Sequence, residues 1–200
     1  MRDTKERILT EALRLFAEGG YEATSVSDIA AALGITKGAL YRHYDSKRAI
    51  LNGILARMET RDAEQARACS LPEGTMQETE QAYGDVSADS VVAFSKAMFR
   101  YWTQDAFAAR FRRMLTVEQF RSGEMSRLYQ QYLVSGPVGY LTDLFAALHV
   151  ERPREEAARF YAPMFLLYSI CDGTEDREEA AAFADGLLED AGERLKGFEN

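Results

Sequence analysis

The stretch of sequence that decides the fold is TSVSDIAAALGITKGALYRHYDSK, residues 24–47. Its first half carries apolar residues at helical spacing: Val26, Ile29, Ala30 and Leu33. Gly34 can take the left-handed conformation that ends a helix, and Thr36 is a suitable cap for a second helix over residues 37–43. We therefore expect two short helices joined by the turn Leu33-Gly34-Ile35-Thr36.

The residues before this stretch predict a longer helix over residues 4–18. Gly19-Gly20 ends it, as glycine commonly does beyond a helix C-terminus. Leu33, Ile35 and Leu40 are expected to seal the corner between the two short helices and to pack on this first helix. Its apolar residues recur at helical spacing: Ile8, Leu9, Ala12, Leu13, Leu15 and Phe16.

Two short helices joined by such a turn indicate a helix-turn-helix, in which the second helix enters the DNA major groove. Lys37 can donate to guanine, the methyl group of Ala39 can contact thymine, and Gly38 permits close backbone approach. Phosphate contacts are expected from the remaining polar candidates. These are Thr24 and Ser25 at the start of the preceding helix, and Tyr41, His43 and Lys47. The alternative is an ordinary helical corner inside an all-helical core.

The charge of the chain is unevenly distributed. The net charge is −8, yet residues 1–50 hold 8 Lys and Arg against 7 Asp and Glu, and residues 51–200 hold 16 against 25. An acidic body with a locally basic head would repel DNA except at one face.

The rest of the chain is also expected to be helical, which makes the fold class all-α. We expect an N-terminal three-helix head, residues 1–50, and a helical body, residues 51–200. Helices are predicted at about 87–102, 106–120, 124–149 and 154–171, followed by a last one that reaches about 196. Gly136-Pro137 should interrupt the third of these, and Pro163 should kink the fourth.

Residues 24–47 resemble the DNA-binding signature of the TetR family of transcriptional regulators, and the resemblance extends over about residues 5–55. It implies an all-α homodimer with a three-helix DNA-binding head and a C-terminal domain that binds a small ligand. Most members repress transcription and leave their operator when the ligand binds. The resemblance adds Arg42 to the base-facing candidates and Thr36 to the phosphate candidates. Ala39 stands where a hydroxyl residue is common in the family, which affects the expected base preference.

The last two predicted helices are candidates for a dimer surface, because one is apolar nearly all round and the other carries small apolar residues at helical spacing. A two-fold-symmetric operator also calls for a dimer. The alternative is a helix packed only on its own subunit. The dimer candidates are Phe160, Met164, Leu167, Ala180, Ala184, Leu187, Leu188 and Ala191.

The body is rich in aromatic residues and Met, and tyrosine is a costly core filler unless its hydroxyl finds a partner. A pocket for an unknown small-molecule effector is therefore expected, with ordinary core packing as the alternative. The candidates are Trp102, Phe111, Met114, Tyr129, Tyr132, Phe165 and Tyr168.

Several other functions find no support in the sequence. It lacks phosphate-binding, nucleophile-elbow and zinc-protease motifs, so we expect no enzyme, no catalytic residue and no cofactor. The two cysteines and two histidines are isolated, so no metal is expected. The N-terminus does not resemble a secretory signal and no apolar run is long enough to span a membrane, which favours the cytoplasm. The remaining alternative is a DNA-binding regulator or activator that needs no ligand.

Overall fold

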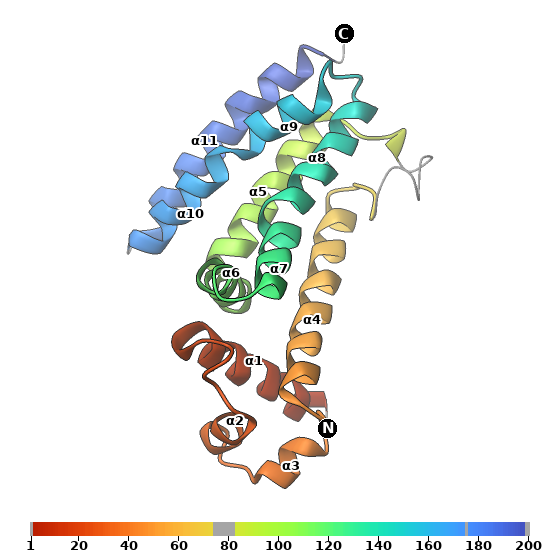
Figure 1. Ribbon diagram of the computed structural model, residues 1–200. Coiled ribbons are helices and arrows are strands. Elements are labelled where there is room, and N and C mark those ends of the chain that lie inside the picture. The colour runs from red at the N-terminus through yellow and green to blue at the C-terminus, as the bar shows by residue number, and fades with distance from the viewer. Residues whose placement is uncertain (1, 74–82, 175, 199–200) are drawn as a thin grey trace. The chain divides into compact units, whose positions relative to one another are not determined.

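The computed structural model describes residues 2–73, 83–174 and 176–198, and all the elements in those ranges are helices (Figure 1). The prediction of an all-α fold is confirmed. The helices are α1 (Arg2–Gly19), α2 (Val26–Ala32), α3 (Lys37–Tyr41), α4 (Lys47–Ala68), α5 (Ala88–Gln104), α6 (Ala106–Glu118), α7 (Gly123–Leu133), α8 (Ser135–Ala147), α9 (Pro153–Tyr161), α10 (Pro163–Gly173) and α11 (Arg177–Lys196).

The chain packs into two compact units that do not follow its linear order. Unit 1 comprises residues 1–61 and 106–129, and unit 2 comprises residues 62–105 and 130–200. Unit 1 therefore takes in α6 and most of α7 as well as the N-terminal helices. The division expected from the sequence, residues 1–50 and 51–200, is a division by function and stays a prediction.

In unit 1, α1 packs against both α6 and α2, and α2 packs against α3. The interior contains the apolar side of α1, with Ile8, Leu13 and Phe16 almost completely buried. Ile50 and Ile54 of α4 are fully buried as well. The first helix predicted from periodicity is thus confirmed, and its apolar side lies inward as expected.

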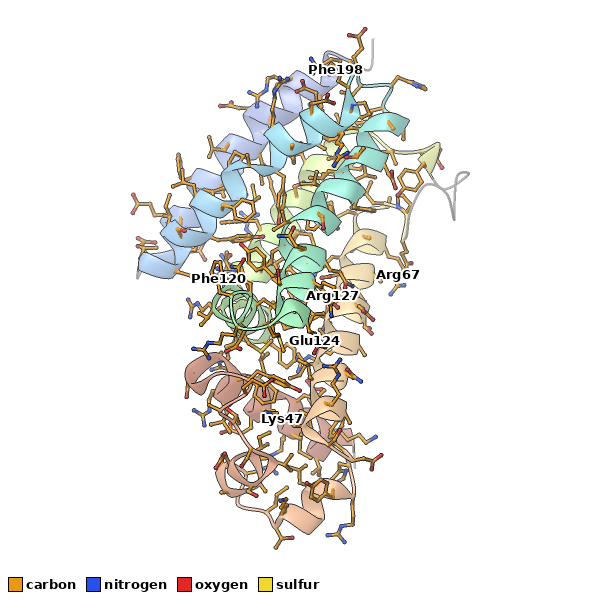
Figure 2. The ribbon with its side chains drawn as sticks, in the orientation of Figure 1. Lys47, Arg67, Phe120, Glu124, Arg127 and Phe198 are labelled. Atoms are coloured by element: carbon orange, nitrogen blue, oxygen red, sulfur yellow. The ribbon has the colours of Figure 1, made fainter. Side chains whose placement is uncertain are left out.

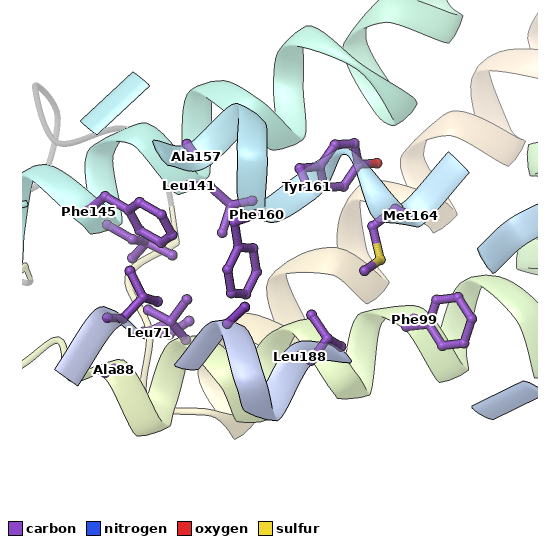
Figure 3. Close-up of a cluster of buried hydrophobic side chains, with 14 of the residues drawn as sticks. Leu71, Ala88, Phe99, Leu141, Phe145, Ala157, Phe160, Tyr161, Met164 and Leu188 are labelled. Carbon is purple, nitrogen blue, oxygen red and sulfur yellow. The ribbon is translucent and has the colours of Figure 1, made fainter. Parts of the chain in front are cut away.

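In unit 2, α5 and α11 lie side by side and run in opposite directions (Figure 1). Ion pairs join them along their length: Arg100 with Asp185, Lys96 with Glu189 at 2.5 Å, and Lys196 with Asp89 at 2.9 Å. The apolar core gathers side chains from α5, α8, α9, α10 and α11 (Figure 3). At its centre the rings of Phe145 and Phe160 meet edge to face, with centroids 5.5 Å apart.

Proline marks the start of two helices and the first turn of a third. The predicted kink at Pro163 falls between α9, which ends at Tyr161, and α10, which begins at Pro163, and Ala162 between them keeps helical dihedral angles. The predicted interruption at Gly136-Pro137 occurs slightly earlier, at Val134 between α7 and α8. Pro137 then falls in the first turn of α8, where a missing N–H leaves no intrahelical bond unmade.

The predicted dimer residues lie on α9, α10 and α11 and are largely covered by their own chain, and their place in a subunit interface stays a prediction. Seven of the eight side chains lie in the core of the chain itself, and Leu187 packs against that core. The seven are Phe160, Met164, Leu167, Ala180, Ala184, Leu188 and Ala191. The apolar face read from the sequence is real, but α5, α8 and α9 of the same chain cover it.

The large apolar side chains that α10 and α11 leave exposed are different ones. Phe165 is 41% exposed, Leu166 59% and Phe183 49%. These residues lie on the sides of their helices that the core of unit 2 does not cover. No helix within the described ranges is both long and apolar enough to cross a membrane.

Candidate nucleic-acid interface

The first of the two short helices, α2, begins with a capping box. The Ser25 hydroxyl accepts a hydrogen bond from the Asp28 amide at 3.2 Å, and the Asp28 carboxylate accepts one from the Ser25 amide at 2.8 Å. Hydrogen bonds that the Asp28 carboxylate accepts from Ser25, from its side chain first and its backbone second, hold the pKa of Asp28 below its ordinary value. The box therefore stays intact as the pH falls, until that carboxylate takes up a proton.

The turn after α2 depends on Gly34. Its φ is +67°, in the left-handed region that an L side chain rarely adopts. The Ile35 amide donates to the carbonyl of Ala30 and the Gly34 amide to that of Ala31, both at 3.0 Å. This pair of bonds is a Schellman motif, which satisfies the last carbonyl groups of α2 and turns the chain toward α3.

The second short helix, α3, is capped by Thr36, whose hydroxyl accepts from the Ala39 amide at 3.1 Å. It ends at Tyr41, sooner than the sequence predicted, and Arg42 forms its C-cap. Leu40 is fully buried, and so is Ile29 of α2. The expected seal depends chiefly on Leu40, because Leu33 and Ile35 are only half-buried.

The opposite side of α3 is open to solvent. Thr36, Lys37, Gly38 and Arg42 are exposed, and Ala39 is half-buried. Tyr41 is 40% exposed, and the Lys37 ammonium lies 5.7 Å from the centre of its ring. Apart from Ala39, the base-facing candidates are all exposed, and their contact with DNA stays a prediction.

The other phosphate candidates divide into two groups. Ser25 is exposed and His43 is half-buried. Thr24 is only 7% exposed, and its hydroxyl donates to the Gly20 carbonyl at 2.9 Å. The Lys47 ammonium donates to the Tyr21 carbonyl at 2.8 Å and lies 4.4 Å from the centre of the Tyr21 ring. Thr24 and Lys47 therefore hold unit 1 together, and we leave them out of the proposed DNA surface.

The structure distributes the predicted ligand residues between the two units. Phe111, Met114 and Tyr129 belong to unit 1. The other four, Trp102, Tyr132, Phe165 and Tyr168, belong to unit 2.

Most of these side chains are packed. Phe111 and Met114 are completely buried, and Trp102 and Tyr132 nearly so. Tyr168 stacks on Phe99, with ring centres 5.8 Å apart. Phe165 is the exception, since it is substantially exposed.

A pocket of about 320 Å³ lies between α5 and α11 of unit 2. Its lining is mainly charged and includes none of the seven predicted ligand residues: Asp89, Val92, Ala93, Lys96, Glu189, Gly192, Glu193 and Lys196. In residues 2–73, 83–174 and 176–198, no three His, Cys, Asp or Glu side chains gather to hold a metal ion.

Two features of the structure were not predicted from the sequence: one buried carboxylate and one set of exposed apolar side chains. One is Glu118, a carboxylate that is only 1% exposed at the end of α6. The other is the set of exposed apolar residues Phe165, Leu166 and Phe183. For Phe183 there was a signal, because it stands among the acidic and small residues of α11. For the burial of Glu118 there was none, because the Tyr21 amide that it contacts lies 97 residues away in the chain.

The N-terminal head is similar in sequence to known bacterial regulators. Residues 8–54 match the family model described as bacterial regulatory proteins, tetR family. YerO of Bacillus subtilis strain 168, an uncharacterized HTH-type transcriptional regulator, is 49% identical over 51 residues. This match covers 26% of the chain and 18% of YerO.

IcaR of Staphylococcus aureus strain Newman, the HTH-type negative transcriptional regulator of the biofilm operon icaADBC, is 46% identical over 46 residues. That match covers 23% of the chain and 25% of IcaR, so both sequence matches span a quarter or less of their relatives. Among solved structures, SmeT in complex with triclosan has a TM-score of 0.67 at 18% identity. It aligns over 94% of this chain and 90% of that one, and at this identity the likeness shows the fold.

An all-helical chain whose three-helix head exposes one short helix after a glycine turn has the architecture of a helix-turn-helix regulator. Residues 8–54 are therefore similar to the DNA-binding head of the bacterial regulatory proteins of the tetR family.

The turn makes a prediction about stability. We expect Gly34→Ala to lower the free energy of unfolding by about 1 kcal/mol, because alanine is strained in the left-handed region. No atom lies within 4 Å of the added Cβ, so crowding does not contribute. Urea denaturation followed by circular dichroism measures the change.

Gly38→Ala is the matched control, because it adds the same methyl group to open space inside α3, where φ is not positive. This substitution should leave stability unchanged or raise it, since alanine favours helix. Equal effects of the two substitutions would contradict the role given to Gly34.

Proposed function

We propose that this chain represses transcription by binding a two-fold-symmetric DNA operator as a homodimer, and that a small molecule releases it. The observation that carries the proposal is the exposed first turn of α3, held outward by the buried Leu40. A helix of this size fits the major groove, where the N-terminal residues of a recognition helix contact base edges. IcaR, which shares the head, is described as a negative regulator.

The charge of unit 1 supports the proposal. Residues 1–61 and 106–129 hold 15 Lys and Arg against 10 Asp and Glu, a net charge of +5. The residues of unit 2 hold 9 against 22, a net charge of −13. Unit 1 is therefore more basic than residues 1–50 suggested, because residues 51–61 add two arginines and one acid and residues 106–129 add five arginines and two acids. Such a field favours the approach of DNA to unit 1, in the cytoplasm where bacterial DNA lies.

Base reading is tested at Lys37. A duplex is first enriched by the wild-type chain from a random-sequence pool. We expect Lys37→Ala to weaken binding to that duplex about tenfold and to relax the base preference at one position, because it removes a donor to base edges. Fluorescence anisotropy at a fixed salt concentration measures the affinity, and repeated enrichment measures the preference.

Arg154→Ala serves as the control, because it removes one exposed positive charge from α9 in unit 2. This variant should bind the duplex like the wild type. If Lys37→Ala changes neither affinity nor preference, α3 does not read DNA through this residue. If the wild type enriches no duplex, the proposed function is wrong.

The homodimer is proposed to form through the exposed sides of α10 and α11. Phe165, Leu166 and Phe183 provide large apolar side chains there. Exposed apolar groups of this kind mark interaction surfaces, and symmetric pairing brings the same patch from both copies together.

We expect Leu166→Arg to shift the chain from dimer to monomer, because pairing would bury the new charge without a partner. Sedimentation velocity at several concentrations measures the change. Phe120→Arg is the matched control, since Phe120 is 86% exposed and belongs to unit 1, away from α10 and α11 in the sequence. A dimer that survives Leu166→Arg, or that Phe120→Arg disrupts equally, would contradict this surface.

The small-molecule effector is proposed to bind among the aromatic side chains of the body. SmeT, which shares the fold, has been solved with triclosan. Tyr168 and Trp102 combine an aromatic ring with an O–H or an N–H group, and side chains of this kind orient ligands in apolar pockets. A ligand releases the operator only if it binds the two conformations of the chain unequally.

A thermal-shift screen of apolar and cationic compounds, triclosan included, tests this part of the proposal. A compound at about 100 times its dissociation constant should stabilise the folded chain by about 2.7 kcal/mol and raise its Tm. The same compound should weaken binding to the enriched duplex. If no compound does both, the chain is better described as a DNA-binding regulator that needs no ligand.

A further inference from the structure

The last residue of α6, Glu118, places a carboxylate in the interior of unit 1. Its side chain is 2% exposed. One oxygen accepts a hydrogen bond from the Arg121 guanidinium at 2.7 Å and a longer one, at 3.4 Å, from the backbone amide of Tyr21. The other oxygen is buried without a hydrogen-bond partner. Burying a charge is costly unless it is paired, so these two contacts are what hold the carboxylate in place.

The residue at the other end of this contact, Tyr21, lies in the connector between α1 and α2 and is held on several sides. Its ring meets Phe16 of α1 edge to face, with centroids 5.0 Å apart. The ammonium group of Lys47 on α4 lies over the same ring and donates a hydrogen bond to the Tyr21 carbonyl. Burial raises the pKa of the Tyr21 phenol, and a hydrogen bond from Arg48 opposes that rise.

A second charge pair ties the same connector to α7. Arg48, which bonds the Tyr21 side chain, also forms an ion pair with Glu124. Glu124 and Lys47, both labelled in Figure 2, lie on α7 and α4. Tyr21 is thus connected to α6 through its amide and to α7 through Arg48.

The connector can accept these contacts because residue 20 is a glycine. Gly20 has φ +94°, and a Cβ there would lie 3.0 Å from the Glu118 carboxylate oxygen and crowd the Arg121 guanidinium. Its carbonyl also accepts the hydrogen bond from the Thr24 hydroxyl. Ser25, the N-cap of α2, follows immediately. The path of the connector therefore fixes where α2 begins, and through the glycine turn it fixes α3.

The segment that carries Glu118 is connected at both ends to unit 2. The segment 106–129, which carries Glu118 and Glu124, enters from unit 2 at Asp105 and returns to unit 2 at Gln130. Both ends of this segment are therefore joined covalently to unit 2, and α4 likewise continues from unit 1 into unit 2. Glu118 is a point in the segment that touches the backbone leading into the DNA-reading helices.

We propose that Glu118 is a positioning residue, which sets the orientation of α2 and α3 through the Tyr21 amide and Gly20. The proposal rests on the DNA-binding function proposed above and names the contact by which it is regulated. A shift of α6 that withdraws the carboxylate releases the connector and lowers operator affinity, without any change in the residues that read DNA.

The test compares Glu118→Leu, Glu118→Gln and the control Val117→Ala in the full chain. Val117 is the preceding residue of α6 and is 54% exposed. Hydrogen exchange of the peptide covering residues 17–25 reports on the connector without DNA. Affinity for the enriched duplex and for a random-sequence duplex reports on reading and on phosphate binding separately.

We expect Glu118→Leu to increase exchange at Tyr21 and to weaken binding to the enriched duplex, each by about tenfold, as befits the loss of a charged acceptor. Binding to the random duplex should change by less than about twofold. Glu118→Gln keeps an acceptor oxygen of the same shape and should stay within about twofold of the wild type, as should Val117→Ala. General destabilisation would instead weaken both duplexes together.

Specific outcomes overturn the proposal. Unchanged exchange in a folded Glu118→Leu chain means that the contact does not hold the connector, and increased exchange with unchanged affinity means that the connector does not position α3. If Glu118→Leu does not fold, Gly20→Ala crowds the same carboxylate from the other side. Wild-type exchange and affinity in that variant would also overturn the proposal. If the wild type enriches no duplex, the proposed DNA-binding function is wrong. Hydrogen exchange without DNA still tests whether Glu118 holds the connector, so the two failures are distinguishable.

Discussion

The burial of Leu40 is the interaction on which the rest of the head depends. Leu40 of α3 and Ile29 of α2 are both fully buried and the two helices pack together, so the opposite side of α3 faces solvent. Because the helix has only five residues, its own hydrogen bonds contribute little to its stability. Tertiary packing and the Thr36 cap therefore hold it. An exposed Lys37 is a consequence of a buried Leu40.

The head is part of a larger packing unit. α1 rests on α6, and Tyr21 is in contact with a buried carboxylate from α6 and with lysine and arginine from α4. The orientation of the short helices α2 and α3 therefore depends on contacts with these neighbours. Under the proposed function, this dependence would let a change elsewhere in the structure alter the orientation of α2 and α3.

In unit 2, the chain itself covers the apolar faces that the sequence suggested for a partner copy. The alanines and leucines of α11 match the pattern of a subunit interface, yet Ala184 and Leu188 are buried by their own chain. Exposed aromatic and aliphatic groups such as Phe183 and Leu166 remain for a partner copy. Periodicity therefore located the faces correctly, but it does not say what covers each one.

By itself, the sequence determined the all-helical class, the glycine turn at Gly34, the Thr36 cap and the helix boundary at Pro163, since each depends on residues within one or two turns of helix. Only the tertiary structure decided that Thr24 and Lys47 point inward, and that α6 joins the N-terminal helices. It also decided that Glu118 meets Tyr21, 97 residues away. The physical reason is range: caps, turns and helical periodicity are local, whereas a buried charge is recognised only when its distant partners are in place.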